Sequence, residues 1–430
     1  MPKGRVLFLR KFFTYDAARP SNFIYATLLV FSSSLILFGV ICSPLRELST
    51  GFMAILTTSA TLITDSISIG GMGAAFVNSG IVTLFSVLLV RWLKVPFSGM
   101  SIACMSLMAG FSLFGKDIIN ILPILLGTRL FAFVKKEPFS HYAYMSLFGT
   151  CLSPVVTEMG LLAEGNPLVQ FILVISIGVF IGFILPPIAT YSLQLHQGYN
   201  LYNVGFAAGL IGLVLASVFR SFGYRFETRL EWSSGNNLSL SIFLFSLFAI
   251  MIITGWVLNG KSFSGFSRIF RHTGRAVADF VLLDSYPIVL INMGIIGSVA
   301  ALYVLLAGGA LCGPTIGGIF AVCGFGAFGK HLRNILPIML GVIVSSFLMV
   351  WNLHDPSVLL AALFSTGLAP IAGRFGWKVG FLAGALHASV VLNVTILQGG
   401  LNLYNNGFAA GLVCIVLLPL IEAFRKDKSL

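Results

Sequence analysis

The chain has 430 residues, of which 57% are hydrophobic and only 9% are charged, and its mean hydropathy is +0.98. Soluble globular chains carry about 25% charged residues, so this composition excludes a water-soluble domain and predicts an integral membrane protein. The net charge of +12 does not point to nucleic acid as a partner, because the basic residues lie mostly beside apolar runs, where they determine membrane topology.

Apolar segments long enough to cross a bilayer as helices recur along the whole chain. In the first half we expect crossings at 23–43, 72–93, 97–114, 118–134, 141–162, 167–189 and 204–219. The pair 97–114 and 118–134 could equally form a re-entrant hairpin. Residues 51–65 are expected to be an interfacial or re-entrant piece, because the matching residues 265–279 carry three arginines, which cross lipid only at high cost.

The second half of the sequence repeats the first. Residues 110–127, GFSLFGKDIINILPILLG, match residues 324–341, GFGAFGKHLRNILPIMLG, at twelve of eighteen positions. Further along, GYNLYNVGFAAGL (198–210) matches GLNLYNNGFAAGL (400–412) at eleven of thirteen positions. We therefore predict an internal duplication: a first transmembrane repeat over 20–222, an extracytoplasmic linker over 223–236 and a second transmembrane repeat over 237–424.

The distribution of basic residues orients the two repeats. Cytoplasmic segments carry the excess of lysine and arginine. The first crossing is preceded by five basic residues, whereas its counterpart near 238–258 is followed by Lys261, Arg268, Arg271 and Arg275. One helix therefore leaves the cytoplasm and the other returns to it. The prediction is an all-α polytopic membrane protein of two inverted-topology repeats, with interrupted or re-entrant helices, about fourteen crossings and both termini cytoplasmic.

Inverted repeats with interrupted helices are typical of transporters and some channels, whose solute site lies at the interface of the repeats. We therefore expect a transporter or channel for a small polar solute. An anion is favoured because two lysines are retained in register, without an acidic cluster suited to a cation. A urea-like channel for a neutral solute and a non-transporting membrane scaffold remain as alternatives. No HExxH, GxSxG or paired-carboxylate pattern indicates an enzyme.

The doubled Gly-Lys phrase supplies the first candidate site. A phosphate-binding P-loop is excluded, because Asp117 and His331 stand where that motif needs serine or threonine. The glycine turn is expected to open onto a helix that carries the lysine in its first turn. The candidate solute-binding residues from this phrase are Lys116, Asn120, Lys330 and Asn334. The alternative is that each lysine snorkels to an interface.

The second candidate site comes from the Asn-Tyr phrases. Asn200, Tyr202 and Asn203, with their counterparts Asn402, Tyr404 and Asn405, place amides and phenols beside a small-residue helix start. Such a segment inside a bilayer must line a cavity or be hydrogen-bonded internally, so these residues form either a solute site or structural turn caps. The acidic pair Asp65 and Asp279 is a candidate for ion or proton coupling, against the simpler interpretation as helix caps or interfacial ion pairs.

The six cysteines lie in or beside apolar segments and show no metal-ligand spacing, so neither a metal site nor a cofactor is predicted. The expected partners are the lipid bilayer and a small-molecule solute. The sequence leaves open whether the chain forms a homo-oligomer.

Taken together, these duplicated phrases resemble a family of uncharacterised, internally duplicated bacterial membrane proteins known as a domain of unknown function, over nearly the whole length. The resemblance implies a location in the bacterial cytoplasmic membrane and names no substrate. A weaker resemblance is to urea transporters. Residues 96–102, PFSGMSI, are similar to their Asn-Pro-Leu-Ser-Gly stretch, although Val95 stands in place of the asparagine. Tyr202-Asn203 is similar to their later Tyr-Asn.

Overall fold

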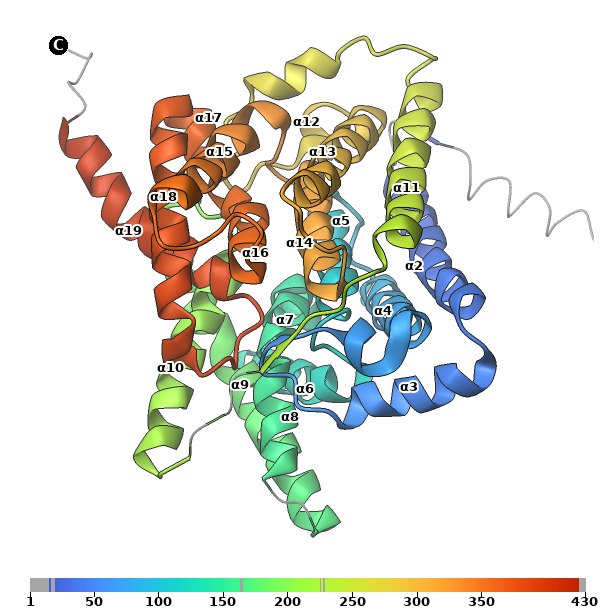
Figure 1. Cartoon of the computed structure of the whole chain (residues 1–430), viewed down its shortest axis with the longest axis vertical. Coiled ribbons are helices and arrows are strands. Elements are labelled where there is room, and N and C mark those ends of the chain that lie inside the picture. The colour runs from blue at the N-terminus through green and yellow to red at the C-terminus, as the bar shows by residue number, and fades with distance from the viewer. Residues whose placement is uncertain (1–14, 17–19, 163–164, 225, 227–228, 425–430) are drawn as a thin grey trace, which may run out of the picture.

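The computed structural model describes residues 15–16, 20–162, 165–224, 226 and 229–424. Most of this part of the chain is helical (Figure 1). The described strands, β1 (Leu62–Thr64) and β2 (Arg229–Glu231), pair in parallel with Leu62 opposite Arg229. The prediction of an all-α, membrane-like fold is confirmed at this level.

The helices of the first half end at recognisable signals. Asp65 caps α4 by accepting a hydrogen bond from Ile67 N, and Asn166 caps α9 ahead of Pro167. Lys136 ends α6 in the left-handed conformation. The elements are α2 (Ser21–Cys42), α3 (Leu45–Thr57), α4 (Ser66–Trp92), α5 (Gly99–Phe111), α6 (Ile118–Lys135), η1 (Phe139–Tyr142), α7 (Ala143–Gly149), η2 (Thr150–Leu152), α8 (Ser153–Leu161), α9 (Pro167–His196) and α10 (Asn203–Ser221).

The second half repeats this order of long, short and broken helices. Its elements are α11 (Asn237–Leu258), η3 (Phe266–Arg271), α12 (Phe280–Leu283), α13 (Tyr286–Leu306), α14 (Gly313–Gly324), η4 (Phe325–Ala327), α15 (Leu332–Leu348), α16 (Pro356–Ser365), η5 (Thr366–Leu368), α17 (Ala369–Phe375), α18 (Trp377–Val394), η6 (Ile396–Gln398) and α19 (Asn405–Phe424).

Ten helices of the described chain are long and apolar enough to cross a bilayer. α5, α14 and α15 are shorter apolar helices. The predicted crossing at 141–162 is interrupted: α7 and α8 are joined by the 3-10 turn at Thr150–Leu152, ahead of Pro154. Proline has no N–H to donate within a continuous helix, so the break falls where the sequence contains Ser153-Pro154, and the matching break between α16 and α17 falls ahead of Pro370.

The two short helices α5 and α14 cross at the centre of the molecule, and their residues are buried along the whole length. Their backbones approach closely at Gly110 and Gly317: a Cβ added at Gly110 would lie 2.8 Å from the Gly317 Cα. Only glycine allows two backbones to come this close. The two halves therefore share one core built around this crossing.

Each half also caps a central helix of the other. The Asp65 carboxylate accepts a hydrogen bond from Gly313 N at the start of α14, with N and Oδ1 3.0 Å apart. Reciprocally, the Asp279 carboxylate accepts one from Gly99 N at the start of α5, at 2.9 Å. Both acids also cap their own helices, at Ile67 N and Val281 N. These hydrogen bonds agree with the simpler interpretation, in which Asp65 and Asp279 are helix caps.

The long axis of the molecule gives it two ends (Figure 1). We call the end with η3 the basic face, because Arg268, Arg271 and the neighbouring Arg333 lie there; an Arg333 guanidinium N–H donates to Phe270 O. We call the end with α3 and the β1–β2 pair the linker face. Figure 1 shows α11 running from the linker face to the basic face, beside α2.

Candidate functional site

The two lysines lie deep in the core. Lys116 is 1% exposed and Lys330 is fully buried. The backbone turns at Gly115 (φ +134°) and Gly329 (φ +115°), a region that favours glycine. Asp117 and His331, not the lysines, are the N-caps of α6 and α15. The prediction that each lysine lies in the first helical turn is therefore wrong, because each lysine precedes the N-cap residue, which has an extended backbone. The lysine side chains are instead buried in the core.

The Lys330 ammonium is fully hydrogen-bonded. It donates to the Tyr202 hydroxyl, to Thr366 Oγ1 at 2.8 Å and to Ala321 O at 3.3 Å. The same nitrogen lies 4.6 Å from the Tyr202 ring centroid and 5.1 Å from that of Phe325. Buried charges are tolerated when they are paired or fully hydrogen-bonded. Lys330 of the second half is therefore held by a tyrosine of the first half.

The Lys116 ammonium is much less well satisfied. The nearest acceptors among the described residues are Met108 Sδ and Leu147 O, each 3.5 Å from Nζ, and the Phe111 ring centroid lies at 5.1 Å. In the repeat, Tyr404 matches Tyr202, so Tyr404 would be the corresponding partner of Lys116. The buried Tyr404 hydroxyl, however, has no hydrogen-bond partner among the described residues. A buried ammonium and a buried hydroxyl that both lack good partners are costly, and such groups accumulate at functional sites.

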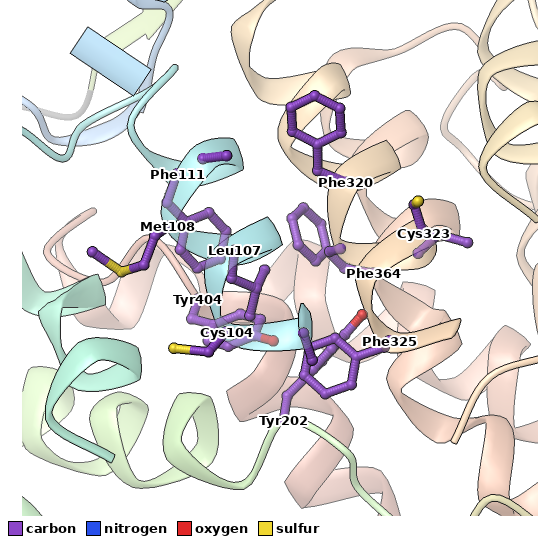
Figure 2. Close-up of a cluster of buried hydrophobic side chains, with 14 of the residues drawn as sticks. Cys104, Leu107, Met108, Phe111, Tyr202, Phe320, Cys323, Phe325, Phe364 and Tyr404 are labelled. Carbon is purple, nitrogen blue, oxygen red and sulfur yellow. The ribbon is translucent and has the colours of Figure 1, made fainter. Parts of the chain in front are cut away.

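The two tyrosines meet at the centre, with ring centroids 4.8 Å apart. Each ends a non-helical segment that docks on the other half: Leu201 N donates to Gly367 O, and Leu403 N donates to Cys151 O, both at 3.0 Å. Figure 2 shows both tyrosines and Phe364 in one cluster with Phe325 and with Cys104, Leu107 and Met108 of α5. The closed centre is thus aromatic, with an ammonium group beside it from each half.

The four asparagines next to these residues mostly hold turns. Asn120 and Asn334 complete capping boxes and donate to Gly115 O and Gly329 O. Asn200 and Asn402 each accept from the tyrosine backbone N–H two residues later, at 2.9 Å. These hydrogen bonds agree with the interpretation of Asn200 and Asn402 as turn caps, and they give Asn120 and Asn334 the same structural role.

Asn203 and Asn405 differ from one another. The Asn203 amide contacts His196 Nε2 at 2.9 Å and donates to Ala189 O at 3.0 Å. Asn405 is 7% exposed, and its Oδ1 has no partner among the described residues.

A cavity of about 220 Å³ lies beside Asn405 and opens near the linker face, where Ile63 and Leu230 line it. Phe114, Phe364 and Leu403 form its inner wall, next to Tyr404. Its polar lining consists of Ser357, Thr395, Asn405 and Asn406, and no charged side chain of the described chain lines it. This cavity therefore brings an open face of the molecule close to the aromatic centre.

Sequence reasoning misses Thr366 as a partner of Lys330. A signal exists, because TCLSP (150–154) and TGLAP (366–370) are counterparts in the two halves. Asn78 of α4 and Asn292 of α13 are a second pair of counterparts next to the lysines. In the structure each donates to the carbonyl of the lysine in its own half at 2.8 Å, Asn78 to Lys116 O and Asn292 to Lys330 O. These amides fix the two Gly-Lys turns.

Among the described residues, no group of three or more His, Cys, Asp or Glu side chains could hold a metal ion. No carboxylate of the described chain lies within ion-pair distance of either buried lysine. The arrangement therefore presents cationic, phenolic and amide groups in an apolar surrounding.

Comparison with known proteins adds a family but no activity. No curated protein matches the chain. No solved structure matches it. A family profile described as "Protein of unknown function (DUF1576)" matches residues 45–221 and 258–423, one region in each half. The chain therefore belongs to this family, and its resemblance to an internally duplicated family of unknown function is confirmed.

Proposed function

We propose that this protein carries a small polar solute across the bacterial cytoplasmic membrane, along a path through the centre where Tyr202, Tyr404 and the two buried lysines lie. The observation that supports it most is the contact of the Lys330 ammonium with the Tyr202 hydroxyl across the two halves. Buried ionisable groups in membrane proteins are costly and commonly mark solute paths. No part of this proposal requires an enzyme activity or a cofactor.

An anionic solute is favoured. Two ammonium groups lie at the centre, and the carboxylates of Asp65 and Asp279 are occupied as caps elsewhere. A neutral, hydrogen-bonding solute is the second candidate, because the polar lining of the cavity beside Asn405 consists of amides and hydroxyls. A membrane scaffold would use neither feature.

Solute flux in proteoliposomes tests the proposal. Uptake of small carboxylates and inorganic anions, against swelling in isosmotic urea and small amides, separates the two solute classes. The proposal expects flux of at least one class well above that of protein-free liposomes. Flux at the protein-free level for every solute, with a stoichiometric protein partner co-purifying, would favour the scaffold.

The proposed topology has two halves inserted in opposite orientations. It has fourteen crossings when α5, α14, α15 and the broken pair α7–α8 are added to the ten long helices, which already include α16–α17 as one span (Pro356–Phe375). Both termini are then cytoplasmic, the basic face is cytoplasmic and the linker face is external. The positive-inside rule supports this assignment. So does the antiparallel course of α2 and α11 in Figure 1.

Cysteine labelling checks this orientation. Ser234 in the linker and Ser264 before η3 are both exposed. In intact cells, a membrane-impermeant thiol reagent should label Ser234→Cys and not Ser264→Cys, and inverted vesicles should show the reverse. Labelling of both positions from one side would refute the inverted arrangement.

A further inference from the structure

The two halves carry the same central residues but hold them differently. Lys330 donates to the Tyr202 hydroxyl and to Thr366 Oγ1. By the repeat, Lys116 should meet Tyr404 and Thr150 in the same way. Instead the Tyr404 hydroxyl has no partner among the described residues. Thr150 Oγ1 donates to Leu147 O at 2.6 Å, as Thr366 Oγ1 does to Leu363 O. Lys116 Nζ, however, lies 3.5 Å from Met108 Sδ and from Leu147 O and makes no hydrogen bond to Thr150 in the described part of the chain.

The same asymmetry extends to the amides that follow the tyrosines. Asn203 is tied to His196 and to Ala189 O. Its counterpart Asn405 has a buried Oδ1 without a partner in the described part of the chain, as does the adjacent Asn406. The cavity that opens near the linker face lies beside these two amides. Val391 is 4% exposed and lines this cavity, whereas its counterpart Ala189 is 0% exposed and its carbonyl accepts a hydrogen bond from Asn203.

These differences coincide. The Tyr202 hydroxyl is bound to Lys330, and the neighbouring Asn203 amide is hydrogen-bonded. The Tyr404 hydroxyl has no partner among the described residues, and the neighbouring Asn405 amide borders the cavity. We propose that the structure is one of two states of an alternating carrier. The cavity beside Asn405 and Asn406 is the solute's binding site in this linker-open state. This inference rests on the proposed transport function and deepens it.

In the second, basic-open state the two halves exchange these contacts. Lys116 donates to the Tyr404 hydroxyl, Lys330 releases Tyr202, and Asn203 leaves His196 to border a corresponding cavity beside Ala189. That cavity opens towards the basic face, because Gly198, at the start of this Asn-Tyr segment, packs against Ala276 there. Two states made from nearly the same local sequence can have similar free energies, as an alternating carrier requires.

The cavity also restricts the solute. Its polar lining is neutral and offers amide and hydroxyl groups from Ser357, Thr395, Asn405 and Asn406. A solute that enters must therefore present hydrogen-bonding groups to this lining, and any negative charge it carries meets Lys116 only on passing Tyr404. The class that fits is a small hydrogen-bonding molecule with at most one compact anionic group.

Paired cysteine accessibility tests the exchange. Val391→Cys reports the linker-open state and Ala189→Cys reports the basic-open state, each labelled by an impermeant thiol reagent from its own face. The background carries Cys42→Ser, because the other five cysteines are buried and none of them lines the cavity. The ratio of the Ala189→Cys rate to the Val391→Cys rate measures the balance between the two states.

Tyr202→Phe and Tyr404→Phe form a matched pair in this assay. Tyr202→Phe removes a hydroxyl that is bonded only in the linker-open state, so the ratio should rise at least tenfold. Tyr404→Phe removes a hydroxyl that is bonded only in the basic-open state, so the ratio should fall at least tenfold. A hydrogen bond to a charged group supports shifts of this size. Both changes keep the aromatic ring, and size-exclusion chromatography confirms that the variants are folded.

A ratio within twofold of wild type in both variants, or a shift in the same direction in both, overturns the exchange. Absence of Ala189→Cys labelling in Tyr202→Phe overturns it as well. Solute flux measured in the same vesicles separates the two proposals. If solute flux is present but the tyrosine variants do not change the labelling ratio, only the exchange of contacts is refuted. If the labelling ratio changes but no tested solute shows flux, transport is refuted and the existence of two states is supported.

Discussion

Replacing Lys330 with methionine is expected to lower solute uptake at least tenfold in protein that still folds. Methionine keeps the apolar stem but removes the ammonium that contacts Tyr202, Thr366 and Ala321. A charge contact at an effective dielectric near 20 is worth on the order of a few kcal/mol, and each tenfold change in affinity corresponds to about 1.4 kcal/mol. Lys116→Met should reduce uptake by a similar factor.

The two variants should differ in stability. Lys330→Met loses three hydrogen bonds and is expected to unfold at a lower temperature than wild type. Lys116→Met loses an ammonium whose nearest acceptors are 3.5 Å away, so its unfolding temperature should be unchanged or higher. The exposed Lys378 provides the matched control, Lys378→Met, which should behave as wild type in both measurements. Uptake within twofold of wild type for both buried-lysine variants would contradict a solute path past the lysines.

Asp65→Ala is expected to destabilise the protein more than either lysine substitution does. The Asp65 carboxylate accepts hydrogen bonds from Ile67 N, Gly313 N, Ser233 N and Ser233 Oγ. Hydrogen bonds to charged groups contribute about 1.5–3 kcal/mol each, so the variant should lose several kcal/mol and yield little monodisperse protein. Asp279→Ala removes bonds to Gly99 N, Val281 N and Leu282 N and should be affected less.

A conservative change at Asp65 also distinguishes a cap from an ion-coupling acid. Asp65→Asn keeps one acceptor oxygen and should retain a partly stable protein whose transport per folded molecule is close to wild type. Asp355→Ala is the mild control, because the Asp355 carboxylate accepts a hydrogen bond from Asn352 N at an exposed turn. An Asp65→Asn protein that melts like wild type but no longer transports would instead establish the coupling role.

The sequence predicts the helices well because each crossing is a long apolar run between basic or glycine-containing turns. The expected segments 23–43 and 118–134 correspond to α2 (Ser21–Cys42) and α6 (Ile118–Lys135) within about two residues. The expected segment 97–114 is longer than α5 (Gly99–Phe111), because the helix ends just after Gly110 contacts α14 and the chain turns at 112–117. Hydropathy cannot show where a buried helix stops.

The contacts between the halves could not be predicted from the repeat. Register pairs Asp65 with Asp279 and Gly99 with Gly313, but it does not say that Asp65 bonds Gly313 rather than Gly99. Likewise, the retained lysines and tyrosines suggest a common site, but nothing local in the sequence shows that Lys330 meets a tyrosine of the other half. Such contacts depend on how the halves pack.

The difference between Lys116 and Lys330 is also invisible in the repeated phrase. Where Cys104, Met108 and Cys151 stand in the first half, the second half has Gly318, Val322 and Gly367. These changes alter the space around each ammonium, yet they look like ordinary variation in an apolar helix. The sequence therefore identifies the central residues without showing which of them are satisfied.

Blocking the cavity beside Tyr404 tests most directly whether solute passes through this centre. Thr395 lines that cavity, and Thr395→Cys, in the Cys42→Ser background, can be modified with a bulky thiol reagent after reconstitution. Ser234→Cys, which lies in the linker outside the cavity, is the matched control. If solute crosses through this centre, modification should lower its flux about tenfold in Thr395→Cys and leave it unchanged in Ser234→Cys. Full flux through a completely modified Thr395→Cys protein would contradict a path through this cavity.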